Sequence, residues 1–365
     1  MRLIITLCAA AAALSTAVLP SAAPPGAGGA GVPAAPGWNA RAAAAFWTPE
    51  RMASARPVPT APGRDEDPAG RAGPGPGDWT GAGDWTGAAG WAGGWDGSGG
   101  PPADGTDTGA GTGADAATGG LAGPELRAVV APGVGQDFDG LPVVGRMFAV
   151  KNGGAYFCTA SAVASPRRDL VLTAAHCMLG GEARQLAFVP RYTAARPQPY
   201  GMFPVSRIWI DPRYRRQGTV RAAALDVAFV QVGPRKDGRR LQDVTGAARL
   251  RTGAGYELPT VRLVGHPAGR ARPRLCVNRT TRFNSPDAKS PGSFLRIRCT
   301  GYPGGTSGGP FLTPSGEVVG VIGGYQTGGN HPDTSYSPAF GADVRTLYEQ
   351  ATGTRKRSAG AASAT

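Results

Sequence analysis

Short apolar stretches that alternate with polar residues fill the chain from about residue 126 to residue 352. Glycine, proline and Asn-Gly pairs separate them, which is the pattern of many short strands joined by turns. Two apolar runs, 143–150 and 156–163, flank Asn152-Gly153-Gly154 and predict a β-hairpin. Further strands are expected at Leu170–Thr173, Gln185–Val189, Phe203–Ile210, Val227–Val232, Val261–Val264, Phe294–Arg298 and Val318–Ile322.

A helix is expected only at the end of this region. Val344, Leu347 and Tyr348 fall at i, i+3 and i+4 within Asp343–Glu349, so they share one face of a helix. Many short strands followed by one helix indicate an all-β protein of the barrel or sandwich class. Residues 126–352 are numerous enough to bury a substantial core, and residues 353–365 are expected to form a disordered tail.

The first 23 residues have the pattern of a secretory signal peptide. Arg2 precedes an uncharged apolar run, Leu3–Leu19, and Ser21-Ala22-Ala23 is a small-residue cleavage site. The apolar run is short for a membrane span, which needs about 20 residues. We therefore expect cleavage rather than a stable membrane anchor, and a secreted, extracellular protein.

Residues 24–125 have a different composition, dominated by glycine, alanine and proline. Such a segment buries too little apolar surface to offset its ordering entropy, so we expect most of it to be disordered. It contains a tandem hexapeptide, Gly77–Ala82 and Gly83–Ala88, each with one tryptophan. The repeat is either low-complexity drift or a binding element, and the whole segment could instead be a propeptide.

The net charge of +13 is unevenly distributed. Residues 1–125 carry 6 arginines against 11 acidic residues, whereas residues 126–365 carry 32 basic against 14 acidic residues. A basic domain can bind polyanions. The arginines are dispersed, however, without a dense basic run or interleaved aromatic residues, so no nucleic-acid partner is expected.

Cysteine usage fits an oxidising compartment. Apart from Cys8 in the signal region, four cysteines remain, and an even number in a secreted chain indicates two disulfides. Three pairings exist. We favour Cys158–Cys177 and Cys276–Cys299, because each closes a short loop between neighbouring strand-like segments. No cysteine pair has zinc-ligand spacing and the three histidines are scattered, so neither a metal nor another cofactor is expected.

Three separated motifs carry the candidate chemistry. Thr173-Ala174-Ala175-His176-Cys177 offers a base, Asp226 precedes the apolar run Val227–Val232, and Ser307 lies within Gly304-Gly305-Thr306-Ser307-Gly308-Gly309-Pro310. A serine hydroxyl needs a neutral imidazole to take its proton, and the imidazole needs a buried carboxylate to orient it. The chain order His, Asp, Ser is the chymotrypsin order.

The glycines beside the serine also have a role in this hypothesis. Acyl transfer builds negative charge on a carbonyl oxygen, which backbone N–H groups stabilise. The amides of Gly305 and Ser307 are the candidates for such an oxyanion hole. His176 must be neutral to act as the base, so activity is expected to fall on acidification.

With these motifs the chain resembles the chymotrypsin-fold serine proteases, of the secreted bacterial trypsin-like and glutamyl-endopeptidase-like kind, over residues 138–350. The resemblance implies two six-stranded antiparallel β-barrels and a C-terminal helix. It also implies a cleft between the barrels, with His176 and Asp226 on the first barrel and Ser307 on the second.

The chain departs from the family pattern at several positions. Thr306 stands where animal trypsins have an aspartate that pairs with the new N-terminus, which puts activation by that ion pair in doubt. The base of the specificity pocket falls at Gly301 and its lining strand at Gly323, Gly324 and Tyr325. None is acidic, so a neutral or apolar preference is expected.

Two other classes of protein compete with this interpretation. Gly305-Thr306-Ser307-Gly308-Gly309 also fits the nucleophile elbow of α/β-hydrolases, but too little chain follows Ser307 for their acid and histidine, in that order. A secreted, non-catalytic binding protein on a protease scaffold is the remaining alternative. We expect a monomeric secreted serine endopeptidase that acts on protein or peptide substrates through an acyl-enzyme.

Overall fold

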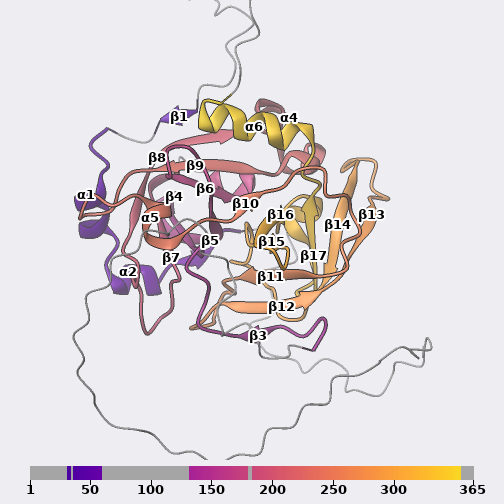
Figure 1. The fold of residues 1–365 in the computed structure, drawn as a ribbon, viewed down its shortest axis with the longest axis horizontal. Coiled ribbons are helices and arrows are strands. Elements are labelled where there is room, and N and C mark those ends of the chain that lie inside the picture. Colours follow the sequence, from indigo (N-terminus) through magenta and orange to yellow (C-terminus); the bar gives the residue numbers. More distant parts are fainter. Residues whose placement is uncertain (1–30, 34–35, 60–130, 180–182, 355–365) are drawn as a thin grey trace, which may run out of the picture.

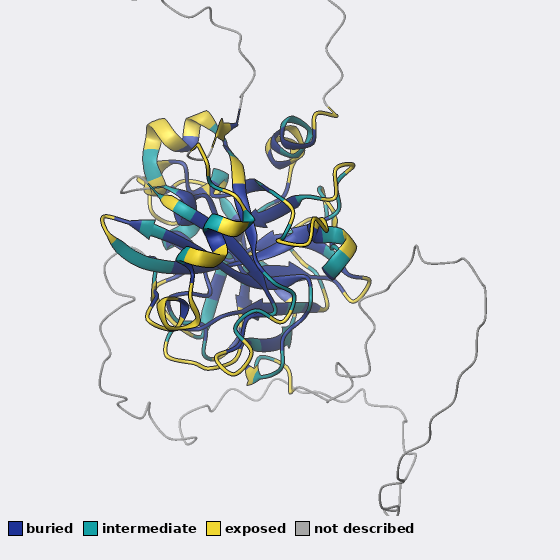
Figure 2. Ribbon diagram, turned by 90° about the vertical axis from the view of Figure 1, so that its left-hand side faces the viewer, coloured by how far each residue is buried: buried dark blue, intermediate teal, exposed yellow. Residues whose placement is uncertain are grey.

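The computed structural model describes residues 31–33, 36–59, 131–179 and 183–354. The predicted signal peptide, most of the glycine-rich segment and the tail from residue 355 lie outside the described residues. Strands dominate the described part, and buried positions fill its centre (Figures 1 and 2). None of its helices combines the length and apolarity that crossing a bilayer requires.

Six strands close into the first barrel, as expected from the resemblance. The order is β8-β7-β4-β5-β6-β9, and β8 pairs again with β9. The strands are β4 (Val144–Lys151), β5 (Gly154–Val163), β6 (Leu170–Thr173), β7 (Arg184–Pro190), β8 (Phe203–Ile210) and β9 (Ala228–Val232). Asn152 and Gly153 both have positive φ at the turn between β4 and β5, which confirms the predicted Asn-Gly hairpin.

The second half differs from the expected six-stranded barrel, because its strands divide between two sheets. One has the order β10-β16-β15-β11-β12-β3 and the other β13-β14-β17. They comprise β3 (Gln136–Asp137), β10 (Arg249–Leu250), β11 (Val261–Gly265), β12 (Arg274–Asn278), β13 (Thr280–Asn284), β14 (Ser293–Arg298), β15 (Pro310–Leu312), β16 (Glu317–Val321) and β17 (Thr334–Pro338).

The two sheets separate where backbone pairing fails. Arg279 alone interrupts the chain between β12 and β13, and the next amide, that of Thr280, donates to Leu258 O instead of a neighbouring strand. Between β16 and β17, the amide of Val321 donates to the Ser337 hydroxyl rather than to a carbonyl. One apolar core nevertheless spans both sheets, because Leu263 and Val319 pack with Leu295 and Ile297.

The predicted C-terminal helix is confirmed as α6 (Ala342–Thr352), which ends at Gly353 in the left-handed conformation. Val344 and Leu347 lie on the buried face of this helix. The sequence patterns missed α3 (Ala175–Met178), α4 (Pro212–Arg221) and α5 (Leu241–Thr245). Asp211 caps α4 and Pro212 occupies its first turn, so that helix did have a local start signal.

The expectation that residues 24–125 would be mostly disordered is wrong for residues 36–59. They form α1 (Ala40–Phe46), α2 (Pro49–Ala53) and β2 (Arg56–Pro57), and β1 (Val32–Pro33) precedes them. Asn39 caps α1 and Thr48 caps α2. Figure 1 shows both helices, coloured indigo, against the first barrel. Both helices are too short to be stable alone, so their burial on that barrel supplies the stabilisation.

Candidate active site

His176 and Asp226 meet because β6 and β9 are antiparallel neighbours. Thr173 at the end of β6 pairs with Ala228 at the start of β9, so the residues just beyond these ends lie together. The Nδ1 atom of His176 lies 2.8 Å from Oδ2 of Asp226, and the backbone amide of His176 donates to Oδ1 at 2.9 Å. The carboxylate therefore fixes both the ring and the main chain of His176.

Asp226 is fully buried and remains ionised because of its partners. Burial alone raises the pKa of its carboxyl, but the charge and hydrogen bond of His176 lower it. The amides of Gly324 and His176 lower it further, so its pKa lies below the usual value. Tyr214 on α4 is also buried, and burial together with the negative charge of Asp226 raises the pKa of its hydroxyl.

Two further contacts hold α3, the short helix that carries His176. The disulfide Cys158–Cys177 ties α3 to β5, which confirms the predicted pairing, as does Cys276–Cys299 in the second half. Lys151 on β4 donates from Nζ to Leu179 O at 2.7 Å and to His176 O at 3.5 Å. Burial lowers the pKa of Lys151 to about 8. Sequence analysis placed Lys151 only in a hairpin and missed this contact.

Metal binding at this place is ruled out by the sulfur chemistry. Cys158, His176 and Cys177 bring their potential ligand atoms within 4.8 Å of one another. Both cysteines are oxidised in the disulfide, so neither can supply a thiolate to a metal ion.

Ser307 lies in a turn of the second half that packs against the strand ends of the first. The amide of Thr159 donates to Ser307 O at 2.8 Å, and a Cβ on Gly308 would lie 3.1 Å from the amide nitrogen of Ala174. These contacts bring the turn 304–309 to the residues flanking His176 and Cys158. The Ser307 hydroxyl is buried and makes no hydrogen bond to any described group.

The carbonyls of the turn fix the directions of the two candidate oxyanion amides. Gly304 O accepts from Ala268 N at 2.8 Å, and Thr306 O accepts from Gly309 N at 2.9 Å. In a trans peptide the N–H points opposite to the C=O. The Gly305 and Ser307 amides are therefore turned away from these partners, and within the described residues neither donates a hydrogen bond.

Thr159 on β5 uses two of its three polar groups, the amide and the hydroxyl, to hold this turn. Its amide bonds to Ser307 O, and its hydroxyl donates to Gly305 O at 2.9 Å while accepting from His266 N at 2.8 Å. Thr173 Oγ1 donates to the remaining group, the carbonyl of Thr159, at 2.9 Å. No sequence motif marked Thr159, because all of these partners are distant along the chain or come from the backbone.

A buried histidine lies under the turn. His266 is 1 % exposed, and neither ring nitrogen has a hydrogen-bond partner among the described residues. Burial, followed by the charge of Arg146, holds its pKa well below the usual range. Arg146 stacks on Phe157 and Tyr192 at 3.9 and 4.3 Å from their ring centroids, and burial lowers its own pKa to about 10.

The four residues expected to form the specificity pocket have three different surroundings. Gly323 and Gly324 adjoin Asp226, since a Cβ on Gly323 would lie 3.0 Å from Oδ2 and the Gly324 amide bonds to the same atom. Tyr325 joins an aromatic cluster with Phe283, Phe294 and Tyr336.

Gly301, the fourth of these residues, has different surroundings. Its amide donates to the Asp333 carboxylate at 3.0 Å, and a Cβ there would collide with Arg274. An acidic residue therefore does lie beside Gly301. It comes from a segment 32 residues further along the chain, so the local sequence gave no sign of it.

Comparisons with known proteins agree with this geometry. Residues 158–321 match a family model described as the trypsin-like peptidase domain, and that range includes His176, Asp226 and Ser307. No curated protein matches the chain significantly by sequence.

Two solved structures are similar over most of the described residues. The protease Anisep from Arthrobacter nicotinovorans is 25 % identical with a TM-score of 0.52, covering 60 % of this chain and 99 % of Anisep. The thermostable serine protease AL20 from an extremophilic microorganism is also 25 % identical, with a TM-score of 0.50, covering 59 % of this chain and 98 % of AL20. Residues 158–321 are therefore similar to the trypsin-like peptidase domain, and the described residues have a chymotrypsin-like fold.

Proposed function

We propose that this protein is a secreted serine endopeptidase that hydrolyses peptide bonds through an acyl-enzyme intermediate. Ser307 attacks the scissile carbonyl, His176 takes its proton and returns it to the leaving amine, and Asp226 orients the imidazole. The observation that carries the proposal is the buried hydrogen bond between His176 and Asp226, with the turn of Ser307 packed beside it.

The amides of Gly305 and Ser307 stabilise the oxyanion of the tetrahedral intermediate in this proposal. Their lack of internal acceptors leaves both N–H groups available to a substrate oxygen. Loss of one such donor typically costs about 10²- to 10³-fold in rate. The buried surroundings increase the effect, because hydrogen bonds to a charged oxygen strengthen where water is excluded.

In this proposal, the Ser307 hydroxyl forms its hydrogen bond to His176 Nε2 only when substrate binds. Without substrate it makes no hydrogen bond, and contacts between nucleophile and base are often long in unliganded enzymes and shorten in the substrate complex. The same observation keeps one alternative open, a binding protein that retains the protease scaffold without catalysis.

The proposal also includes a substrate preference and the limits of the domains. We propose that Gly301, Gly323, Gly324 and Tyr325 contact the residue preceding the cleaved bond and favour a neutral or apolar side chain, since none of the four is acidic. The domain limits proposed are a signal peptide (1–23), a segment (24–125), a peptidase domain (126–352) and a tail (353–365). The disulfides support secretion.

A two-barrel architecture is also part of the proposal. In this proposal the second half acts as one barrel, with an opening at Arg279 and a second one between β16 and β17. The amide of Gly323 donates to Tyr336 O at 3.0 Å just beyond β16, which supports such a bridge.

Covalent labelling with a fluorophosphonate tests the proposed activity. The protein is expected to form one adduct, on Ser307, and Ser307→Ala is expected to lose both the label and peptide hydrolysis. Ser335→Ala is a matched control, because Ser335 is also fully buried with an unbonded hydroxyl. Folded, disulfide-intact protein that takes no label would favour the binding-protein alternative.

A further inference from the structure

The N-terminal segment, residues 31–33 and 36–59, covers an apolar face of the first barrel. Phe148, Phe157, Tyr192 and Met202 on that face form one cluster with Trp47 and other buried residues of the segment. Ala43, Trp47 and Met52 have no exposed surface. Without the segment, these barrel side chains would form an exposed aromatic patch, which soluble monomers rarely tolerate.

Trp47 is the central contact of this interface. Its ring centroid lies 5.2 Å from that of Phe148, and its Nε1 donates to Gln185 O at 2.6 Å. Trp38 adds a second such bond, from Nε1 to Leu186 O at 2.8 Å. Large aromatic side chains whose polar atom is also paired are typical of the residues that dominate stable interfaces.

Strand pairing fixes the segment at both ends. Val32 pairs with Ile208 across β1 and β8, and Arg56 pairs with Tyr156 across β2 and β5. The amide of Val58 then donates to Phe157 O at 3.0 Å. The segment therefore adds to opposite parts of the barrel sheet and encloses the face between them (Figure 1).

The segment does not occupy the candidate active site. Within the described residues, none of its hydrogen bonds, strand pairs or ring contacts involves His176, Asp226 or Ser307. An inhibitory propeptide would have to contact the catalytic residues, whereas the strand pairs and tryptophan hydrogen bonds of this segment go to β5, β7 and β8. The geometry fits a permanent support better than an inhibitor.

Phe157 connects the segment to the turn of Ser307. Its carbonyl accepts from Val58, and its ring stands where a Cβ on Gly305 would be, with Cε2 only 2.5 Å from that position. Gly305 has φ +89°, which glycine adopts readily, and no larger residue would fit there against the Phe157 ring. Displacing the segment would free Phe157 and with it the floor of the proposed oxyanion hole.

We propose that residues 31–59 form a permanent second chain of the peptidase domain, which stays bound when residues 60–130 are cut and keeps the turn 304–309 in its active conformation. The association does not depend on the proposed function, whereas the effect on activity rests on it. Every contact described above lies outside residues 60–130, so cutting there leaves the interface intact.

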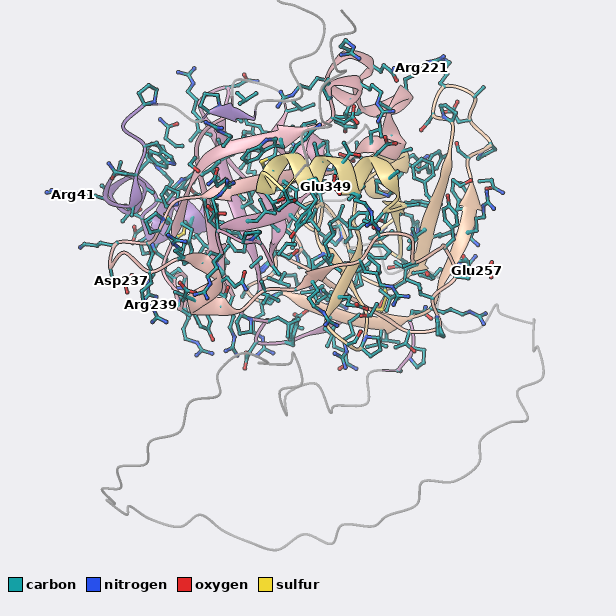
Figure 3. The ribbon with its side chains drawn as sticks, turned by 45° about the horizontal axis from the view of Figure 1, so that its top comes forward. Arg41, Arg221, Asp237, Arg239, Glu257 and Glu349 are labelled. Atoms are coloured by element: carbon teal, nitrogen blue, oxygen red, sulfur yellow. A yellow bond between two sulfur atoms is a disulfide. The ribbon has the colours of Figure 1, made fainter. Side chains whose placement is uncertain are left out.

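An engineered cleavage site tests the association. The recognition sequence of a site-specific protease is inserted after Gly99, and the purified, cut protein is passed through a sizing column. We expect both fragments to elute together in neutral buffer and to separate in concentrated urea. Trp47→Ala is expected to release the N-terminal fragment. Arg41→Ala is the control from the same helix, since Arg41 points away from the barrel (Figure 3). Wild-type fragments that separate in neutral buffer would overturn the proposal.

The same cut protein tests the effect on the catalytic turn. Removing the N-terminal fragment is expected to lower kcat at least tenfold, and adding a synthetic peptide of residues 31–59 is expected to restore it. Unchanged kcat after complete removal would overturn this part of the proposal while the association stands. If uncut protein neither hydrolyses peptides nor takes a fluorophosphonate, the proposed function has failed, and the sizing column still decides the association.

Discussion

At the scale of single residues, Thr159 is the side chain whose removal should affect the turn most directly. Its hydroxyl donates to Gly305 O and accepts from His266 N, so Thr159→Val leaves two buried backbone groups without partners. Each unpaired group costs about 1–3 kcal/mol of folding free energy. We expect kcat to fall about 10- to 100-fold with little change in KM, because the amides of the proposed oxyanion hole would act mainly in the transition state. Steady-state kinetics on a peptide substrate measures both.

Two further variants separate positioning from general loss of stability. Thr159→Ser keeps the hydroxyl and should recover most of kcat. Thr245→Val removes a buried hydroxyl that bonds to Leu241 O on α5, away from the site, and should lower the melting temperature without lowering kcat in folded protein. Equal kcat losses in Thr159→Val and Thr245→Val would contradict the positioning role.

Asp226 should also affect how the free energy of unfolding changes at acidic pH. Its folded pKa lies below the ordinary value of 3.8, so the unfolded chain takes up the proton first as the pH falls. The contribution of Asp226 is therefore present above about pH 3.8 and is lost as the pH drops toward the folded pKa. Urea unfolding at a series of pH values should show a weaker decline in this range for Asp226→Asn than for the wild type. Equal slopes would count against the carboxylate's buried interactions.

At the scale of elements, the two disulfides can be compared directly, because they close loops of similar length. They close loops of 19 and 23 residues, so replacing either pair by serines should cost about 3 kcal/mol of unfolding free energy. Only Cys158–Cys177 adjoins both His176 and Thr159, so only its removal should also lower kcat in protein that remains folded. Chemical unfolding and kinetics on both double variants test this, and equal kcat losses would contradict it.

Local signals explain which elements the sequence could predict. The hairpin of β4 and β5 combines alternating apolar residues with an Asn-Gly turn, so its prediction needs no tertiary information. β17 is mostly polar, and it becomes a strand only because β14 pairs with it along its whole length. In α1 and α2, the capping residues Asn39 and Thr48 were visible, but helices of seven and five residues are stable only through tertiary packing, which the local sequence does not show.

The residues of the candidate site also differ in whether the sequence could predict them. His176, Asp226 and Ser307 lie in local motifs whose chemistry can be recognised in the sequence. Thr159 and Lys151 contribute through backbone carbonyls on other elements, and such partners leave no sequence pattern.

At the scale of the whole molecule, the N-terminal helices should open only when the barrel does. Trp47 and Met52 are fully buried, and their amides are bonded to Ala43 O and Thr48 O. Native-state hydrogen exchange should therefore give these two amides protection similar to that of β4 and β5. Protection several orders of magnitude lower in α1 and α2 than in β5 would mean that the segment detaches independently.

The central claim is that three distant side chains act together with two main-chain amides, and a crystal structure of the fluorophosphonate-treated protein tests it most directly. We predict phosphorus bonded to Ser307 Oγ, its oxygen within hydrogen-bond distance of the Gly305 and Ser307 amides, and His176 Nε2 facing the same group. A phosphorylated residue other than Ser307, or an adduct oxygen that neither amide contacts, would contradict the account.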